Sequence, residues 1–334
     1  MFWLPAGRSI RWQLIERNTM DQNKLLVIGD ANIDIIINGL EHMPEMGKEV
    51  FVDNVSMRVG GGAANVAFGL TNLNCSVMFC GALGNDLHGR YIEKNMMAAN
   101  IDITYLAFHN NLPTGISVSI SNGDDRLFIS SMGANSAVDP THICSKTLHE
   151  VSHVHISICD PRQSLEPYIN IAEQAHNHGC TVSLDIGWTD DAWDTEKLFN
   201  LLELTDVFFP NICEARCICG YEASIDELGS YLLKFVRDIV VVTCGADGAT
   251  AFRQNERRSD KYEADAVDSV GAGDAFDAGF LCAYVERLPL STCLAYGCAC
   301  GSIAVSRIGG GSTVPSKSEL LKAIALHKAN DLTQ

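Results

Sequence analysis

The sequence is poor in basic and aromatic side chains and has no long uninterrupted apolar run. Lys and Arg number 24 against 41 Asp and Glu, so the formal net charge is −17, and aromatic residues make up only 7% of the 334 residues. A nucleic-acid partner requires basic surface stripes, so none is expected. No apolar run reaches the roughly 18 residues of a membrane span, so a membrane partner is not expected either.

Disulfide and zinc frameworks are also absent. The thirteen cysteines are an odd number, and the two tighter groups, at 213–219 and 293–300, lack the C-x-x-C pairs of a zinc site. We interpret them as reduced, mostly buried thiols of a cytoplasmic protein.

The first nineteen residues differ from the rest. They contain three arginines and two tryptophans, without the apolar centre and small-residue cleavage site of a secretory signal. We expect Met20 to be the natural start, residues 1–19 to be a non-native or disordered extension, and residues 20–334 to form a single domain.

The remaining chain alternates short apolar runs with helical patterns. Continuous apolar runs predict strands at 25–28, 77–80, 151–156, 181–185, 207–209 and 239–243. Helices are predicted at 63–73, 89–99, 165–178, 275–287, 291–306 and 316–327. Strands without polar alternation, each followed by a helix, indicate an α/β fold whose mostly parallel sheet is covered by helices on both faces.

Two regions of the chain have a different pattern of apolar and polar residues. Residues 49–52, 114–120 and 126–129 alternate apolar and polar side chains, and 121–124 reads as a turn. We expect a small antiparallel β lid from about 38–59 and 104–132, lying over one edge of the large sheet. Its exposed β-branched edge predicts a homodimer in which two lids pair.

The strongest chemical signal is the stretch Asp268–Phe276, with the sequence DSVGAGDAF, at the start of an apolar helix. Glycines let the backbone turn with its N–H groups exposed, and the helix start adds a positive dipole end, so the turn forms an anion hole. Asp274 beside such a hole is suited to accept a hydroxyl proton during phosphoryl transfer. The plainer interpretation is an N-capping Asp after a glycine turn.

Several nucleotide-binding patterns are missing. There is no G-x-x-x-x-G-K-[ST], no H-R-D or D-F-G set, and no G-x-G-x-x-G after the first strand. These absences exclude the P-loop and protein-kinase patterns and argue against a nicotinamide dehydrogenase.

From Lys24 to the C-terminus the chain resembles the ribokinase-like (PfkB-type) family of carbohydrate kinases, and its fructokinase-like members in particular. Four motifs stand in the family's order. They are GGGAAN at 60–65 running on to GALGNDLHG at 81–89, NICE at 211–214, TCGADG at 243–248, and the DSVGAGDAF stretch. The resemblance implies the ribokinase-like fold and an ATP-dependent phosphotransferase that acts on a hydroxyl of a small sugar.

The resemblance also implies catalytic and sugar-binding roles. Asp274 would be the general base, and the amides of three residues would hold the transferred phosphate: Gly271, Ala272 and Gly273. Four residues would bind the sugar: Asp34, Gly60, Gly61 and Asn65. Asp34 and the glycine turn also have the plainer interpretations of a surface strand residue and a helix start.

Nucleotide and metal roles follow in the same way. Thr243, Gly245 and Gly248 would line the ATP site. Asn211 and Glu214 would organise waters of an Mg²⁺ ion, although the pair also reads as a capped helix start. A potassium-binding loop of some members is matched by Asp268 and Val270, together with Ala304, Gly309 and Thr313.

Departures from the family pattern leave the substrate open. Ribokinases read GGKGAN where this chain has Gly62 and Ala63, which favours fructose over ribose. Gly297-Cys298 stands where the family often places an Asn near the adenine. His153 and His155 share a strand face without further ligands, so we interpret them as structural. A nucleoside kinase and a non-catalytic sugar sensor are the alternatives.

Overall fold

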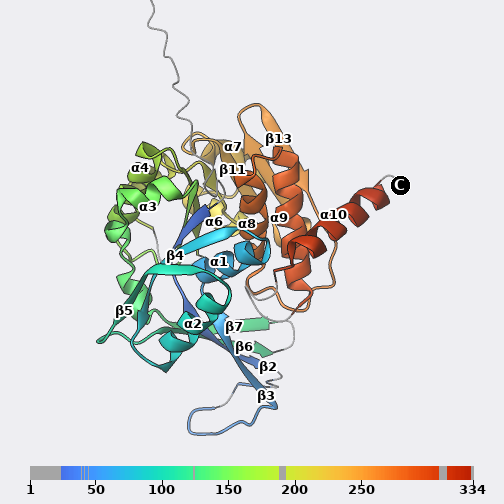
Figure 1. The fold of residues 1–334 in the computed structure, drawn as a ribbon. Helices are drawn as coiled ribbons and strands as arrows, with labels where there is room; N and C mark the ends of the chain where they lie inside the picture. Colours follow the sequence, from blue (N-terminus) through green and yellow to red (C-terminus); the bar gives the residue numbers. More distant parts are fainter. Residues whose placement is uncertain are drawn as a thin grey trace, which may run out of the picture.

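A long, mostly parallel sheet forms the centre of the protein in the computed structural model, which describes residues 24–38, 40, 42–43, 45–122, 125–187, 193–307 and 314–331 (Figure 1). Among these residues the sheet has nine strands in the order β13-β12-β11-β10-β9-β8-β1-β4-β5. The strands are β1 (Lys24–Ile28), β4 (Ser76–Gly84), β5 (Asp102–His109), β8 (His153–Ile158), β9 (Thr181–Ile186), β10 (Val207–Phe208), β11 (Ile239–Thr243), β12 (Ala249–Arg253) and β13 (Glu256–Asp260). Neighbouring strands are parallel from β11 to β5, and β12 and β13 add antiparallel strands at the other edge.

Helices cover both faces of this sheet, as the uninterrupted apolar strands predict. On one face lie α1 (Gly62–Asn72), α2 (Leu87–Ala98), α8 (Ala272–Val285), α9 (Leu290–Val305) and α10 (Lys317–Asp331). On the other lie α3 (Ser145–Glu150), α4 (Glu166–Asn177), α5 (Thr195–Leu202), α6 (Ile212–Cys219) and α7 (Ile225–Leu232). Alternate residues of β1 supply the two cores: Leu25 and Val27 join the α8 side, and Leu26 and Ile28 the α4 side.

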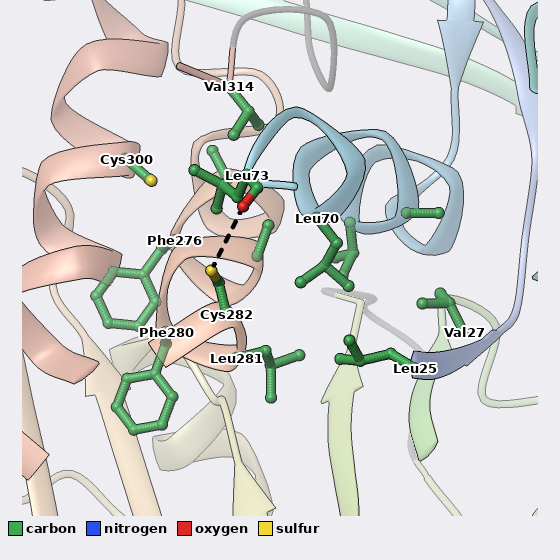
Figure 2. Packing of buried hydrophobic residues seen from close by; sticks show 14 of the residues in the cluster. Leu25, Val27, Leu70, Leu73, Phe276, Phe280, Leu281, Cys282, Cys300 and Val314 are labelled. Atoms are coloured by element: carbon green, nitrogen blue, oxygen red, sulfur yellow. Dashed lines mark hydrogen bonds between the residues drawn. The ribbon is translucent and has the colours of Figure 1, made fainter. Parts of the chain in front are cut away.

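The α8 face has the packing shown in Figure 2, where Leu70 and Leu73 of α1 meet Leu281 and Cys282 of α8. A Cβ atom placed at Gly69 would lie only 2.7 Å from the Cβ of Ala278, so a glycine is needed for α1 and α8 to approach this closely. The two helices therefore form one rigid pair, and each begins at a glycine-rich turn.

A second, smaller sheet has the order β3-β2-β6-β7 and lies at one end of the molecule (Figure 1). It comprises β2 (Asn32–Asn38), β3 (Asn54–Gly60), β6 (Gly115–Asn122) and β7 (Asp125–Ser131). The predicted fold class is confirmed, with one difference of detail: β2 and β6 pair in parallel, so the lid is antiparallel only at its two outer pairs.

The predicted lid boundaries need three corrections. Residues 104–109 belong to β5 in the large sheet, and residues 49–52 form no strand. The lid instead contains β2, whose run of isoleucines resembles a buried strand because its inner half packs on the core. The turn at 123–124 and the predicted extension at 1–19 lie outside the described residues.

Three short 3₁₀ turns, at Gly133–Ala137, Pro140–His142 and Gly245–Asp247, complete the described elements. Within the described ranges, no helix combines the length and apolar character needed to cross a bilayer.

Candidate functional site

The DSVGAGDAF stretch folds as a tight turn that leads into α8. Gly271 precedes the helix with φ of 74°, in the left-handed region that favours glycine. The Ala272 amide donates to the Ser269 carbonyl at 3.3 Å, so one of the three predicted phosphate-binding amides has a partner within the turn. A Cβ placed at Gly273 would meet no atom within 4 Å. The turn therefore leaves open space next to Asp274, where an anionic group can approach.

Asp274 faces the start of α1. Its Oδ2 accepts a hydrogen bond of 2.7 Å from Nδ2 of Asn65. Burial raises the pKa of Asp274 to about 7, the Asn65 hydrogen bond opposes this, and the charges of Asp30 and Asp34 raise it further. The carboxylate is thus poised near neutral pH, which is the range in which a general base is most effective.

Asp34 lies on the inward face of the lid, close to the glycine turn. A Cβ placed at Gly60 would lie 2.1–2.3 Å from the carboxyl atoms of Asp34, so only glycine permits this approach. Nδ2 of Asn32 donates to Oδ1 of Asp34 at 2.7 Å. Burial raises the pKa of Asp34 to about 6, with Asn32 opposing. The fold therefore brings Asp34, Gly60, Asn65 and Asp274 together at one end of α1 and α8.

Asp30 was not predicted to have a role, although it stands in the same sequence stretch as Asp34. Its carboxylate accepts hydrogen bonds from the amides of Gly62 at 3.3 Å and Ala63 at 3.2 Å. Gly61 has φ of 97°, and a Cβ there would lie 2.8 Å from the Asp30 carbonyl oxygen. Asp30 therefore fixes the glycine turn on β1. The signal available in the sequence was a carboxylate directly after the first buried strand.

A cavity of about 800 Å³ extends from the α8 turn along the sheet end. The predicted nucleotide residues Thr243, Gly245 and Gly248 line it, as do Ala272 and Gly273. Its size is typical of a small-molecule site. The structure thus joins the TCGADG loop and the anion-hole turn in one space, although the two are separated in the sequence.

Other lining residues were missed by the sequence interpretation. The segment from Lys261 to Ala266 forms one wall, and Phe276, Cys298 and Val305 form an apolar part. Lys261–Ala266 follows an exposed edge strand and has no apolar periodicity, so its sequence alone gave no signal. Cys298, at the position where the family often has Asn, does lie in the cavity wall.

Asn211 and Glu214 form the reciprocal cap of α6. Oδ1 of Asn211 accepts from the amides of Cys213 and Glu214 at 2.8 and 2.9 Å, and Oε2 of Glu214 accepts from the Asn211 amide at 2.8 Å. The capped-helix interpretation is therefore confirmed. Burial nevertheless raises the pKa of Glu214 to about 7.

Two further carboxyl groups lie near Glu214 and were not predicted. Burial raises the pKa of both Asp185 and Asp277, and repulsion from Glu214 and Asp274 adds to the shift. Glu214 and Asp277, which are buried, and Asp185 and Asp274, which are half-buried, thus form a cluster of carboxyl groups that a divalent cation would neutralise. In the described residues no three His, Cys, Asp or Glu side chains are arranged as a complete metal ligand set.

The structure describes only some of the residues that match a potassium-binding loop. Asp268 is buried, its Oδ1 accepts from the Val270 amide at 2.9 Å, and its own amide donates to the Val305 carbonyl at 3.0 Å. This holds the loop against the end of α9, next to Ala304. Gly309 and Thr313 lie outside the described residues.

His153 and His155 are fully buried in the large sheet and share a network with hydroxyl groups. His153 contacts Thr181 Oγ1 and Ser183 Oγ at 2.7 Å each, and His155 Nδ1 contacts Ser183 Oγ at 2.8 Å. Burial lowers the pKa of both to about 3, so both rings are neutral. These contacts support the structural interpretation.

Comparisons with known proteins agree with this geometry. The family model described as pfkB family carbohydrate kinase matches residues 22–317. A ribokinase of Arabidopsis thaliana is 29% identical over 311 residues, covering 90% of this chain and 80% of that protein. A nucleoside kinase of Methanothermobacter thermautotrophicus is 26% identical over 304 residues, covering 90% and 96%.

A solved structure has the same fold. The structure of Arabidopsis thaliana ribokinase complexed with ribose and ATP superposes with a TM-score of 0.80 at 26% identity, covering 90% of this chain and 98% of that one. The family match includes the glycine turn, the α6 cap, the TCGADG loop and the α8 turn. The chain therefore belongs to the pfkB family of carbohydrate kinases.

Proposed function

We propose that the protein transfers the γ-phosphoryl group of ATP to a hydroxyl group of a small sugar. One observation carries the proposal, which is the position of Asp274, a carboxyl group with a pKa of about 7. On one side of it is the open α8 turn, which lines the end of the cavity, and on the other side are the glycine turn, Asn65 and Asp34. The cavity accommodates the nucleotide, and the Asp34 side accommodates the acceptor.

In the proposed reaction, Asp274 accepts the proton of the sugar hydroxyl as its oxygen attacks the γ-phosphorus. Asn65 holds the carboxylate through the 2.7 Å hydrogen bond and so fixes its direction. The backbone amides at Gly271 and Gly273 face the developing negative charge on the transferred group. Asp34 accepts hydrogen bonds from other sugar hydroxyls.

The carboxyl cluster fits Mg²⁺. Glu214 on α6, Asp185 on β9 and Asp277 on α8 would hold the ion's water shell, since no cation of the described residues is among the groups that shift their pKa values. The bound ion would neutralise charge on the ATP phosphates. We likewise propose that the Asp268–Val270 loop, which precedes α8, holds a potassium ion.

Fructose is the proposed substrate. Gly62 occupies the position of the ribokinase lysine, and a Cβ there would lie 2.9 Å from Ser157 Oγ and 3.5 Å from Asp274 Oδ1. A lysine would therefore reach into the acceptor side, whereas glycine leaves room for a ketohexose. Ribose is the competing acceptor, because relatives of this chain are named ribokinases.

The test is ADP release from ATP and Mg²⁺ with a panel of fructose, ribose, other sugars and nucleosides. We expect turnover with a sugar, fastest with fructose, and a loss of about 10²–10⁴-fold in kcat for Asp274→Asn. Asp226→Asn is the matched control, since that side chain is 58% exposed on α7 and does not line the cavity.

The other outcomes separate the alternatives. Turnover with nucleosides but not sugars would make the protein a nucleoside kinase, a name that one relative carries. Sugar binding without ADP release by the wild type would make it a sensor. Full activity of Asp274→Asn would remove the assigned base.

A further inference from the structure

Two cysteines meet at the end of the α1–α8 pair that is remote from the glycine turns. Cys75 follows the C-terminus of α1 and is half-buried, and Cys282 lies in the third turn of α8 and is fully buried. The two thiols are hydrogen-bond partners. Sγ of Cys282 also lies 3.9 Å from the Leu73 carbonyl oxygen, the contact drawn in Figure 2, which places it directly under the end of α1.

A lysine completes the cluster. Nζ of Lys317, at the start of α10, donates to Sγ of Cys282 at 3.0 Å and to Oε1 of Glu286 at 3.0 Å. The Lys317 side chain is 19% exposed and Cys75 is half-buried, so the cluster reaches solvent through these two residues, whereas Cys282 itself is fully buried. A thiol within hydrogen-bond distance of an ammonium group has the surroundings of a reactive cysteine rather than of a packing residue.

Electrostatics distinguishes Cys282 from the other buried thiols. The hydrogen bond from Cys75 lowers the pKa of Cys282 to about 7, burial opposes this, and Lys317 lowers it further. Burial instead raises the pKa of Cys293, Cys298 and Cys300. Cys75 and Lys317 therefore favour the thiolate form of Cys282, against the opposing effects of burial and of the Glu286 carboxylate, whose Oε1 lies 4.0 Å from Sγ.

We propose that Cys75 and Cys282 form a redox-active dithiol that hydroperoxides oxidise to a disulfide. The Cys282 thiolate attacks a peroxide oxygen: an S–O bond forms, the O–O bond breaks, and Lys317 lies where it can protonate the leaving oxygen. The Cys75 sulfur then attacks the sulfenic sulfur, the S–S bond forms, and water leaves with the Cys75 proton. Two thiols and one hydrogen peroxide thus give one disulfide and two waters.

The bond would cross-link the helices whose other ends hold Asn65 and Asp274. Only the end of α1 and the middle of α8 are joined, on the side away from the cavity. The proposal stands on this cluster alone and does not depend on the substrate or the reaction of the site.

Peptide mapping of the wild-type protein is the test. After treatment with hydrogen peroxide and blocking of free thiols, trypsin yields residues 59–90, with Cys75 and Cys80, and residues 262–287, with Cys282 as the single cysteine. We expect a linked pair of these two peptides, two hydrogens lighter than their sum, which dithiothreitol separates.

Variants assign the bond and its chemistry. Cys75→Ser should abolish the linked pair, whereas Cys80→Ser and Cys300→Ser should retain it. Lys317→Met should slow its formation about tenfold at pH 7, because the thiolate loses its cation. The wild-type measurement requires no variant to fold. Absence of the linked pair, its persistence in Cys75→Ser, or oxidation of Cys282 no faster than of Cys293 would overturn the proposal.

Discussion

At the scale of single residues, the role proposed for Asp274 links burial to catalysis. The carboxylate must be deprotonated to accept a proton, and its pKa of about 7 is raised by burial and by the charges of Asp30 and Asp34. We therefore expect kcat/KM to rise as the pH increases from 5 and to level off above about pH 8, with a midpoint near 7 in the free enzyme.

The contribution of the neighbouring charges to the midpoint of this pH profile can be measured separately. Asp34→Asn removes one of the charges that raise the pKa of Asp274, so the midpoint should move to lower pH while kcat/KM falls overall. The profiles are measured with the best acceptor of the sugar panel, at constant ionic strength. A midpoint that stays in place in Asp34→Asn would mean that Asp34 and Asp274 are not electrostatically coupled.

The candidate site shows which residues a sequence can reveal. Asp274, Asn65 and Asp34 stood in recognisable motifs, and the fold brings them together. Asp185 and Asp277 had no such signal, because each acts through the burial and charge of groups distant in the sequence. A buried carboxylate on a strand or helix reads like any polar residue until its neighbours in space are known.

At the scale of elements, the nucleotide loop depends on one backbone position. Gly248 has φ of +82°, and a Cβ there would lie 2.2 Å from the Asp260 carbonyl oxygen. Gly248→Ala should therefore displace the loop and raise the KM for ATP by about tenfold, because the cavity wall moves.

A matched control exists at the end of α6. Gly220 has φ of +75°, but no atom lies within 4 Å of a Cβ placed there. Gly220→Ala should cost about 1 kcal/mol in the free energy of unfolding from backbone strain, without changing the KM for ATP. The two variants are compared by ADP-release kinetics and by denaturant unfolding. Equal values of KM would show that the close contact at Gly248 does not position the loop.

The elements were predictable where one physical rule dominated. Buried parallel strands such as β1, β4 and β11 contain continuous apolar runs, and helices such as α2 and α4 have clear periodicity, so these elements were located within a few residues. The lid was harder to predict because its strands have different surroundings along their length. The inner part of β2 packs on the core and reads as a buried strand, and β5 has the mixed pattern of a strand at the sheet edge.

At the scale of the whole molecule, the lid exposes an apolar surface. Met57, Ile35, Val118 and Ile129 occupy one row across the four strands, and Met57 and Ile129 are 43% and 61% exposed. The sequence predicted pairing of two lids through an exposed strand edge; we propose that the two copies pair through this row on the face of the lid.

The double variant Met57→Lys with Ile129→Lys tests this pairing. Charges in the row should give a monomer in sedimentation velocity at micromolar concentration, whereas the wild type should sediment as a dimer. Leu326→Lys on α10 is the control, because that side chain is also exposed, at 67%, but lies away from the lid. A wild type that is monomeric at these concentrations contradicts the pairing.

The carboxyl cluster makes the stability of the whole molecule depend on pH. The folded pKa values of about 6 for Asp34 and about 7 for Glu214 and Asp274 lie above the ordinary values near 4. Between pH 4 and 7 these three carboxyl groups therefore bind more protons in the folded state than in the unfolded state. Their contribution to the free energy of unfolding falls as the pH rises through this window, whereas His153 and His155, whose pKa values burial lowers to about 3, contribute in the opposite direction.

Asp277→Asn should reduce this loss. It removes one of the mutually repelling groups, so without Mg²⁺ we expect it to be more stable than the wild type by about 1–3 kcal/mol at pH 8 and closer to it at pH 5. Denaturant unfolding across this pH range is the measurement. Glu173→Gln, which changes the net charge equally at an exposed position of α4, should leave the slope unchanged. Added Mg²⁺ should stabilise the wild type more than Asp277→Asn, because the ion neutralises the repulsion that the variant has already reduced.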